Sequence, residues 1–116
     1  MIKGITLLKR KTGLTPEEFR EQFEEVHVPL ALKLLPTVRK LVRNYVITTN
    51  AIPTSTEEPE FDCITEQSFD DMPGFQAMMD TGSEDAGQAL IHSLKVCVDI
   101  DKVVEFLVEE VESEIT

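Results

Sequence analysis

One histidine stands where it could transfer a proton to or from a bound molecule. His27 follows apolar residues at helical spacing and precedes Pro29, so we expect it at a helix end, facing the mouth of a cavity. An imidazole with its ordinary pKa of about 6.5 can act as general base or acid near neutral pH. The alternative is that His27 only binds a carbonyl of the last helical turn.

The extended segment Phe61–Phe69 holds a second group of candidates. Alternation along a strand sends Asp62, Ile64, Glu66 and Ser68 to one face and the residues between them to the face that helices cover. An interior carboxylate is costly unless it is paired or functional. We therefore predict Asp62 and Glu66 as catalytic partners of His27, brought together where the end of the first helix lies over this strand. Alternatively, Glu66 forms a buried ion pair with Arg43.

Other side chains could hold a substrate. Tyr45 and Arg43 share one face of the extended segment Leu41–Thr49. Tyr45 could donate its hydroxyl to a substrate oxygen, or belong to the core or to an interface. His92 is predicted at the surface or in a lid, and Phe75 on an apolar helix face. The predicted substrate-binding residues are Tyr45, Arg43, Ser68, Phe75 and His92.

Composition narrows the classes of partner and cofactor. The chain has 116 residues and a net charge of −11, which disfavours nucleic acid and anionic membranes as partners. Cys63 and Cys97 lack the spacing of metal ligands, so we predict free buried thiols and no metal. The sequence has no Walker loop and no Rossmann fingerprint, and we predict no cofactor. No apolar run could span a membrane and no segment resembles a signal peptide, so we expect a cytoplasmic protein.

The first half of the chain predicts a strand followed by a well-marked helix. Ile2–Lys9 is rich in β-branched and apolar residues and ends at a turn. Thr15, Pro16 and Glu18 form the pattern of a capping box at a helix start. The residues expected on the buried face are Phe19, Phe23 and Val26. We expect Pro29 to end this helix, with a second short helix at Leu30–Leu35.

The second half adds three strands and two helices. The expected elements are strands Leu41–Thr49, Phe61–Phe69 and Val103–Val111, a loop Asn50–Glu60, a helix capped by Asp70 or Asp71 and running through Met79, a helix Glu84–Leu94, and an extended lead-in Val96–Asp101. The order βαββαβ with an extra helix predicts an α+β, ferredoxin-like domain over residues 1–116. Its four-stranded antiparallel sheet would carry helices on one face.

The face of this sheet without helices is too apolar for an isolated monomer. Apolar side chains beyond those that one helix layer could cover are Ile5, Leu7, Tyr45, Ile47, Ile64, Phe106 and Val108. An exposed apolar face of this extent indicates a partner, so we expect a homodimer.

The order of these motifs resembles the EthD-like family of the dimeric α+β barrel superfamily. The resemblance rests on Gly13-Leu14-Thr15-Pro16 and on His27-Val28-Pro29-Leu30-Ala31, and it continues along nearly the whole chain. It implies that two open sheet faces close into a shared barrel. The matching histidine recurs in the family motif, as does an acid at the Glu66 position. Ser68 stands where relatives often have an aromatic residue, which implies a larger pocket. Asp99 matches an acid before the last strand, where we expect a cap or turn.

The resemblance implies a small cofactor-independent enzyme of the lyase or isomerase type. It would isomerise, cyclise, dehydrate or decarboxylate an aromatic, polyketide-like or lactone substrate in an apolar pocket. His27 would be the base or acid, Glu66 or Asp62 its partner, and Tyr45 would polarise a carbonyl. Two alternatives are a cofactor-free monooxygenase of the same superfamily and a non-catalytic dimeric binding or accessory protein of a degradation pathway. Haem is disfavoured because the chain has no Trp, with His92 its only conceivable ligand.

Overall fold

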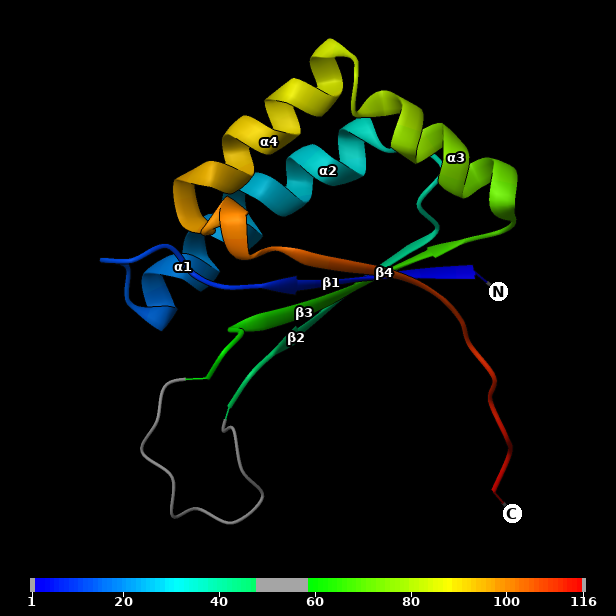
Figure 1. Ribbon diagram of the computed structural model, residues 1–116, viewed down its shortest axis with the longest axis horizontal. Coiled ribbons are helices and arrows are strands. Elements are labelled where there is room, and N and C mark those ends of the chain that lie inside the picture. Colours follow the sequence, from blue (N-terminus) through cyan, green and yellow to red (C-terminus); the bar gives the residue numbers. More distant parts are fainter. Residues whose placement is uncertain (1, 48–58, 116) are drawn as a thin grey trace.

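The centre of the molecule is a four-stranded antiparallel sheet (Figure 1). A computed structural model describes residues 2–47 and 59–115. The strands are β1 (Ile2–Leu8), β2 (Lys40–Tyr45), β3 (Cys63–Phe69) and β4 (Val104–Glu109), in the order β2-β3-β1-β4. The predicted α+β, ferredoxin-like class is confirmed, although Thr48 and Thr49 and most of the predicted loop Asn50–Glu60 lie outside the described residues.

All the helices cover the same face of the sheet (Figure 1). They are α1 (Pro16–Gln22), α2 (Val28–Leu34), α3 (Met72–Thr81) and α4 (Asp85–Cys97), with a 3-10 turn at Ile100–Lys102. Among the described residues, none of the helices is long and apolar enough to cross a membrane. Asp71, one of the two predicted caps, accepts a hydrogen bond from the backbone of Gly74 at the start of α3. The prediction that Val96–Asp101 is extended is mostly wrong. Helix α4 continues to Cys97 and the 3-10 turn begins at Ile100, so only Val98 and Asp99 between them are extended.

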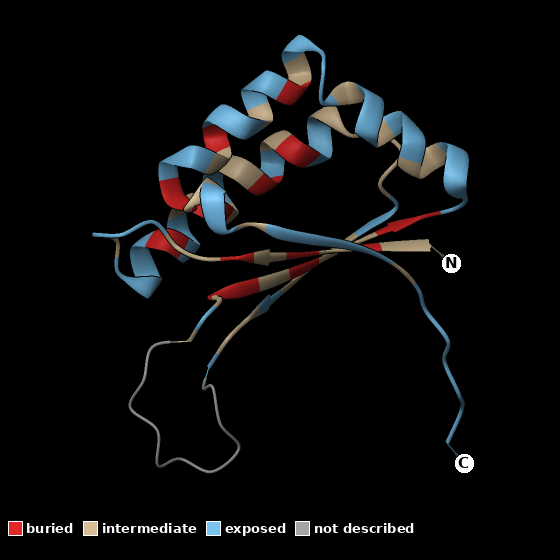
Figure 2. Ribbon diagram, in the orientation of Figure 1, coloured by how far each residue is buried: buried red, intermediate tan, exposed pale blue. Residues whose placement is uncertain are grey.

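The core lies between the central strands and the inner sides of the helices (Figure 2). The register pairs Leu8 with Cys63 and Thr6 with Thr65, which turns these four side chains toward the helices, as the alternation along β3 predicts. Cys63 and Cys97 are free and fully buried. Burial raises the pKa of the Cys63 thiol to about 12 and that of Cys97 to about 11, so both thiols stay protonated at neutral pH.

The capping box at the start of α1 is confirmed. The backbone N–H of Glu18 donates to Thr15 Oγ1 at 3.1 Å, and the backbone N–H of Thr15 donates to Glu18 Oε1 at 3.0 Å. These bonds hold the pKa of Glu18 below its ordinary value. The cap fixes where the helix begins and therefore which side chains face the core.

The prediction that Pro29 ends the first helix is wrong. Helices α1 and α2 join through a π-helical turn, Phe23–His27, in which the Val28 N–H donates to the Phe23 carbonyl five residues back. The wider turn relieves the clash that a proline ring normally makes with the preceding turn, so the chain stays helical across Pro29. The extra residue in the turn also rotates the helix face. Val26, predicted as buried, is 45% exposed, and His27 instead stacks on Phe23.

The sheet face without helices is apolar along three strands. In the observed register, Ile5 pairs with Phe106 and Leu7 with both Ile64 and Val104, so these side chains share that face. Tyr45 does not belong to it as predicted. It pairs with Cys63, which turns the phenol toward the helices. The predicted Ile47 lies beyond the end of β2 and is exposed.

Replacing Thr15 by alanine should lower the free energy of unfolding by about 1 kcal/mol, because a first-turn N–H loses its acceptor. For a chain of this size the melting temperature should fall by about 4 °C. Thr12→Ala, in the exposed turn before the helix, is the control and should leave melting unchanged. Equal melting of the Thr15→Ala and parent proteins would show that the capping box does not form.

Candidate functional site

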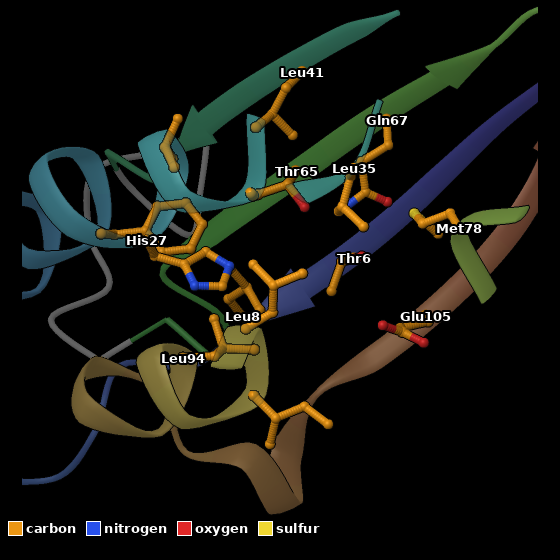
Figure 3. A pocket seen from close by; sticks show the side chains of 15 residues that line it. Thr6, Leu8, His27, Leu35, Leu41, Thr65, Gln67, Met78, Leu94 and Glu105 are labelled. Atoms are coloured by element: carbon orange, nitrogen blue, oxygen red, sulfur yellow. The ribbon is translucent and has the colours of Figure 1, made fainter. Parts of the chain in front are cut away.

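A cavity of about 180 Å³ lies between the helices and the sheet (Figure 3). Its floor comes from the inward faces of all four strands, and its walls from α2, the π turn, α4 and the end of α3. Most of the lining is apolar, and the polar exceptions are Thr6, His27, Thr65, Gln67 and Glu105. A largely apolar cavity with a few polar groups is typical of a small-molecule site.

His27 projects from the π turn into this cavity, near Leu8 and Leu94 (Figure 3). Its ring stacks on Phe23, with 5.2 Å between the ring centroids, and its Nδ1 lies 3.3 Å from Ser93 Oγ on α4. Burial lowers the pKa of His27 from 6.5 to about 4, so the imidazole is neutral at physiological pH. A neutral imidazole can take up a proton at one ring nitrogen while the other is held by Ser93.

Three polar side chains on the cavity floor were not predicted as site residues. Thr6 on β1 and Thr65 and Gln67 on β3 face the helices, where a strand position normally carries an apolar side chain. Polar residues at strand positions that face the helices are the sequence signal that identifies these side chains as site candidates. The strand alternation predicts that Thr65 and Gln67 face the helices, but it does not by itself assign them a function. Glu105, on the edge strand β4, was missed as well.

The predicted meeting of His27 and Glu66 is wrong, because Glu66 lies on the opposite face of the sheet. The alternation that turns Thr65 and Gln67 toward the helices turns Glu66 away from them. Its carboxylate accepts hydrogen bonds from Lys3 Nζ at 2.9 Å and from Asn44 Nδ2 at 2.9 Å. These donors hold the pKa of Glu66 below its ordinary value, so Glu66 is an ionised, paired carboxylate.

Asp62 is also absent from the cavity lining. It is buried just before β3, where it accepts a hydrogen bond from the Arg10 backbone N–H at 2.9 Å. Its carboxylate also lies 3.3 Å from Arg10 Nε and 3.5 Å from Lys9 Nζ. Asp62 therefore ties the end of β1 to the start of β3, and the structure assigns it a position away from His27.

Arg43 and Tyr45 belong to a cluster around Glu24 rather than to the cavity wall. Arg43 donates to both carboxylate oxygens of Glu24, at 2.9 and 2.8 Å, so the predicted ion pair between Arg43 and Glu66 does not form. The Tyr45 hydroxyl also donates to Glu24, and the Arg20 guanidinium lies 4.3 Å from the centroid of the phenol ring. Arg43 holds the pKa of Glu24 low, whereas burial raises that of Tyr45. This cluster joins the first helix to β2.

The remaining predicted residues have separate positions. Ser68 is buried but sits on the same face of β3 as Glu66. Phe75 packs edge-on against Phe69 and lines a second, neighbouring cavity. His92 is exposed on α4 and is absent from the cavity lining. Asp99 accepts a hydrogen bond from the Asp101 backbone N–H, the predicted turn. Within residues 2–47 and 59–115, the acids, cysteines and histidines form no cluster that could hold a metal ion.

Solved structures share this fold along nearly their whole length. An EthD-family protein from Bacillus halodurans superposes with a TM-score of 0.70 at 21% identity, over 96% of this chain and all of that one. HapK from Hahella chejuensis superposes with a TM-score of 0.66 at 14% identity, over 100% of this chain and 98% of that one. A dimeric ferredoxin-like protein of unknown function from Thermobifida fusca superposes with a TM-score of 0.57 at 17% identity, over 92% of this chain and 88% of that one. At these identities the likeness concerns the fold alone.

Comparison of the sequence with protein families is more specific than the structural likeness. None of the curated proteins matches this chain. The model of the EthD domain matches residues 11–89, which include the capping box, the π turn with His27, strands β2 and β3, and helix α3. These residues make up more than half of the chain. The protein therefore belongs to the EthD domain family.

Proposed function

We propose that the protein binds a small aromatic, polyketide-like or lactone molecule in the cavity and that His27 moves a proton on it. One observation carries the proposal: a neutral imidazole, oriented by Ser93 and Phe23, lines an otherwise largely apolar cavity between the helices and the sheet. The reaction class would be isomerisation, cyclisation, dehydration or decarboxylation. Such a reaction needs the substrate positioned and a proton accepted and returned.

The cavity walls favour a flat, mainly apolar ligand. Phe23, Leu94 and Met78 offer aromatic, aliphatic and thioether surfaces that pack well against rings. On the floor, the Thr65 hydroxyl and the Gln67 amide could donate hydrogen bonds to a carbonyl or phenol oxygen. A ligand with both an apolar ring and an oxygen substituent would satisfy the two kinds of surface.

The proposed step transfers one proton within the bound molecule. The free ring nitrogen of His27 takes a proton from a carbon next to a carbonyl, and the C–H electron pair passes into the enolate. The imidazolium then returns the proton to another atom of the same molecule. Burial makes His27 a weak base in the empty cavity, but a neighbouring enolate stabilises the imidazolium and raises the pKa of the ring as the proton moves.

Phenylacetone, a one-ring ketone, provides a direct test of this step. The protein should catalyse exchange of its benzylic hydrogens with deuterium from the solvent, because in heavy water the imidazolium can exchange its proton for a deuteron before it protonates the enolate. Proton NMR follows the loss of the benzylic signal. Replacing His27 by asparagine should slow the catalysed exchange about 10²–10⁴-fold, the usual contribution of a positioned base. His92→Asn, at an exposed histidine of α4, is the matched control and should keep the parent rate.

Equal exchange by the His27→Asn and parent proteins would remove His27 from the chemistry. Binding of phenylacetone without any catalysed exchange by the parent would instead support the non-catalytic binding protein. The low proton affinity of His27 in the empty cavity is the observation that favours that second function.

The stability of the protein should depend on pH through His27. The pKa of its imidazole is about 4 in the folded chain and 6.5 when the side chain is fully solvated, so between these values the unfolded chain binds a proton that the folded chain does not. The contribution of His27 to the free energy of unfolding has its full value above pH 6.5 and falls as the pH drops toward 4. The shift corresponds to about 3 kcal/mol at most, and partial solvent exposure reduces it to about 1–2 kcal/mol.

Denaturant unfolding of three proteins at pH 7 and pH 4.5 measures this effect. The parent and His92→Asn should lose more stability on acidification than His27→Asn, by about 1–2 kcal/mol. Carboxylates common to all three proteins cancel in the comparison. Parallel loss of stability by His27→Asn and the parent would show that His27 is not buried in its neutral form.

We further propose that two copies pair through the sheet face that carries no helices. Phe106, 52% exposed, and Val104 lie on this face together with Ile5, Leu7 and Ile64. An apolar face of this kind is costly in water. The fold neighbour from Thermobifida fusca is described as dimeric, which supports dimerisation here.

Light scattering at micromolar concentration should give twice the 13.1 kDa mass of one chain. Phe106→Glu should shift the protein toward the monomer by placing a charge in the contact. Leu32→Glu, at a 54% exposed apolar position of α2, is the control and should stay dimeric. A parent protein that scatters as a single 13 kDa species would contradict the dimer.

A further inference from the structure

A second cavity adjoins the one that holds His27. Its volume is about 220 Å³, and it lies between strands β1 and β4 and helix α3. The two cavities share the lining residues Thr6, Gln67, Met78 and Glu105. Figure 3 shows these four side chains at one end of the first cavity, with His27 at the other. The two volumes therefore meet at a junction of three polar side chains and one methionine.

We propose that the two cavities form one elongated ligand site, in which the second cavity is a distal subsite for the part of the molecule that does not react. This proposal rests on the proposed function, because it extends the same site. It narrows the substrate class to uncharged molecules with an extended body, either several rings or a ring with a long apolar chain. An oxygen substituent would lie at the junction.

The junction is suited to bind an oxygen. Gln67 offers both an amide N–H and a carbonyl, and its side chain makes no hydrogen bond within residues 2–47 and 59–115. Space for it comes from Gly4, its partner on β1, where an added Cβ would lie 3.0 Å from Gln67 Oε1. Thr6 also lines both cavities. A ligand hydroxyl or carbonyl can bond to these groups as the molecule passes from one cavity to the other.

The distal walls are suited to rings or alkyl chains. Phe75, Met78 and Met79 project from α3, and Leu107 lies on β4 across from them. Edge-on packing against Phe69, with 5.7 Å between ring centroids, orients Phe75. Methionine side chains are flexible and polarisable, so they adapt to different apolar shapes. Helix α3 buries none of its residues fully, so part of each side chain on it is accessible.

The charge at the junction excludes one kind of ligand. Glu105 lies on the lining of both cavities, and a carboxylate in a partly apolar site repels an anionic ligand. The net charge of −11 acts in the same direction. The distal subsite should therefore accept an alkyl phenol and reject the corresponding benzoate.

Calorimetric titration with 2-propylphenol and 2-octylphenol tests the elongated site, because in these molecules the hydroxyl neighbours the chain and can lie at the junction while the chain enters the second cavity. Each methylene buried should raise affinity about threefold, so burial of at least three of the five additional methylenes should make octylphenol bind the parent at least about 30-fold more tightly than propylphenol. Met79→Trp fills the distal cavity and should reduce this ratio to below about threefold without changing propylphenol binding. Met72→Trp is the matched control, since both methionines lie on α3 and are 49% exposed, but Met72 lines neither cavity.

A second variant and an anionic ligand complete the test. Leu107→Trp fills the distal cavity from β4 and should act as Met79→Trp does, while unchanged propylphenol binding shows that each variant is folded. 2-Octylbenzoate, whose carboxylate would lie at the junction near Glu105, should bind the parent at least about tenfold more weakly than octylphenol. An octyl-to-propyl ratio that is the same in Met79→Trp, Leu107→Trp, Met72→Trp and the parent would overturn the distal subsite.

The two proposals can fail separately. Ala31→Phe adds a ring to the wall of the first cavity only, and it should abolish propylphenol binding. If propylphenol does not bind the parent, or binds Ala31→Phe equally well, the proposed function fails and the elongated site fails with it. If propylphenol binding requires the first cavity but the longer chain gains nothing from the second, only the elongated site is overturned.

Discussion

The candidate site depends on the packing of two phenylalanines, Phe19 in α1 and Phe23 at the start of the π turn, onto the central strands. Phe19 and Phe23 are almost fully buried, stack with 5.7 Å between their centroids, and share one core cluster with Leu8 and Cys63. This contact fixes how far the helix lies from the sheet and how it is rotated about its axis. Because the π turn begins at Phe23, the same contact determines where His27 points.

The cavity follows from a local departure from regular helix geometry. An ordinary α-helix would keep Phe19, Phe23 and Val26 on one inward stripe. The π turn adds a residue, moves Val26 into solvent and places His27 against Phe23 and Ser93. π-helical turns often occur at functional sites, where they direct a side chain at the expense of helix regularity. Here the result is a buried imidazole, with its pKa lowered to about 4, above a partly polar sheet floor.

The sequence predicted most of the fold because its signals are local. The capping box, the strand alternation and the helix cap at Asp71 each involve residues within a few positions of one another. The site was harder to predict because it depends on which face of the sheet His27 meets. The alternation along β3 already assigned Glu66 to the face without helices, yet Glu66 was expected beside His27, which lies on the helix-covered face. Glu66 instead binds Lys3 and Asn44. The π turn has no simple sequence signal, so the continuous helix through Pro29 was missed.

The central claim, a neutral His27 exposed to a ligand cavity, can be observed directly in the nitrogen NMR spectrum of the imidazoles. The chain has only two histidines, so the spectrum is simple to assign with His92→Asn. At pH 5.5 the ring of His27 should show the nitrogen shifts of a neutral tautomer, and adding 2-propylphenol should move them while those of His92 stay in place. A protonated His27 at this pH, or shifts that do not respond to the ligand, would contradict the account.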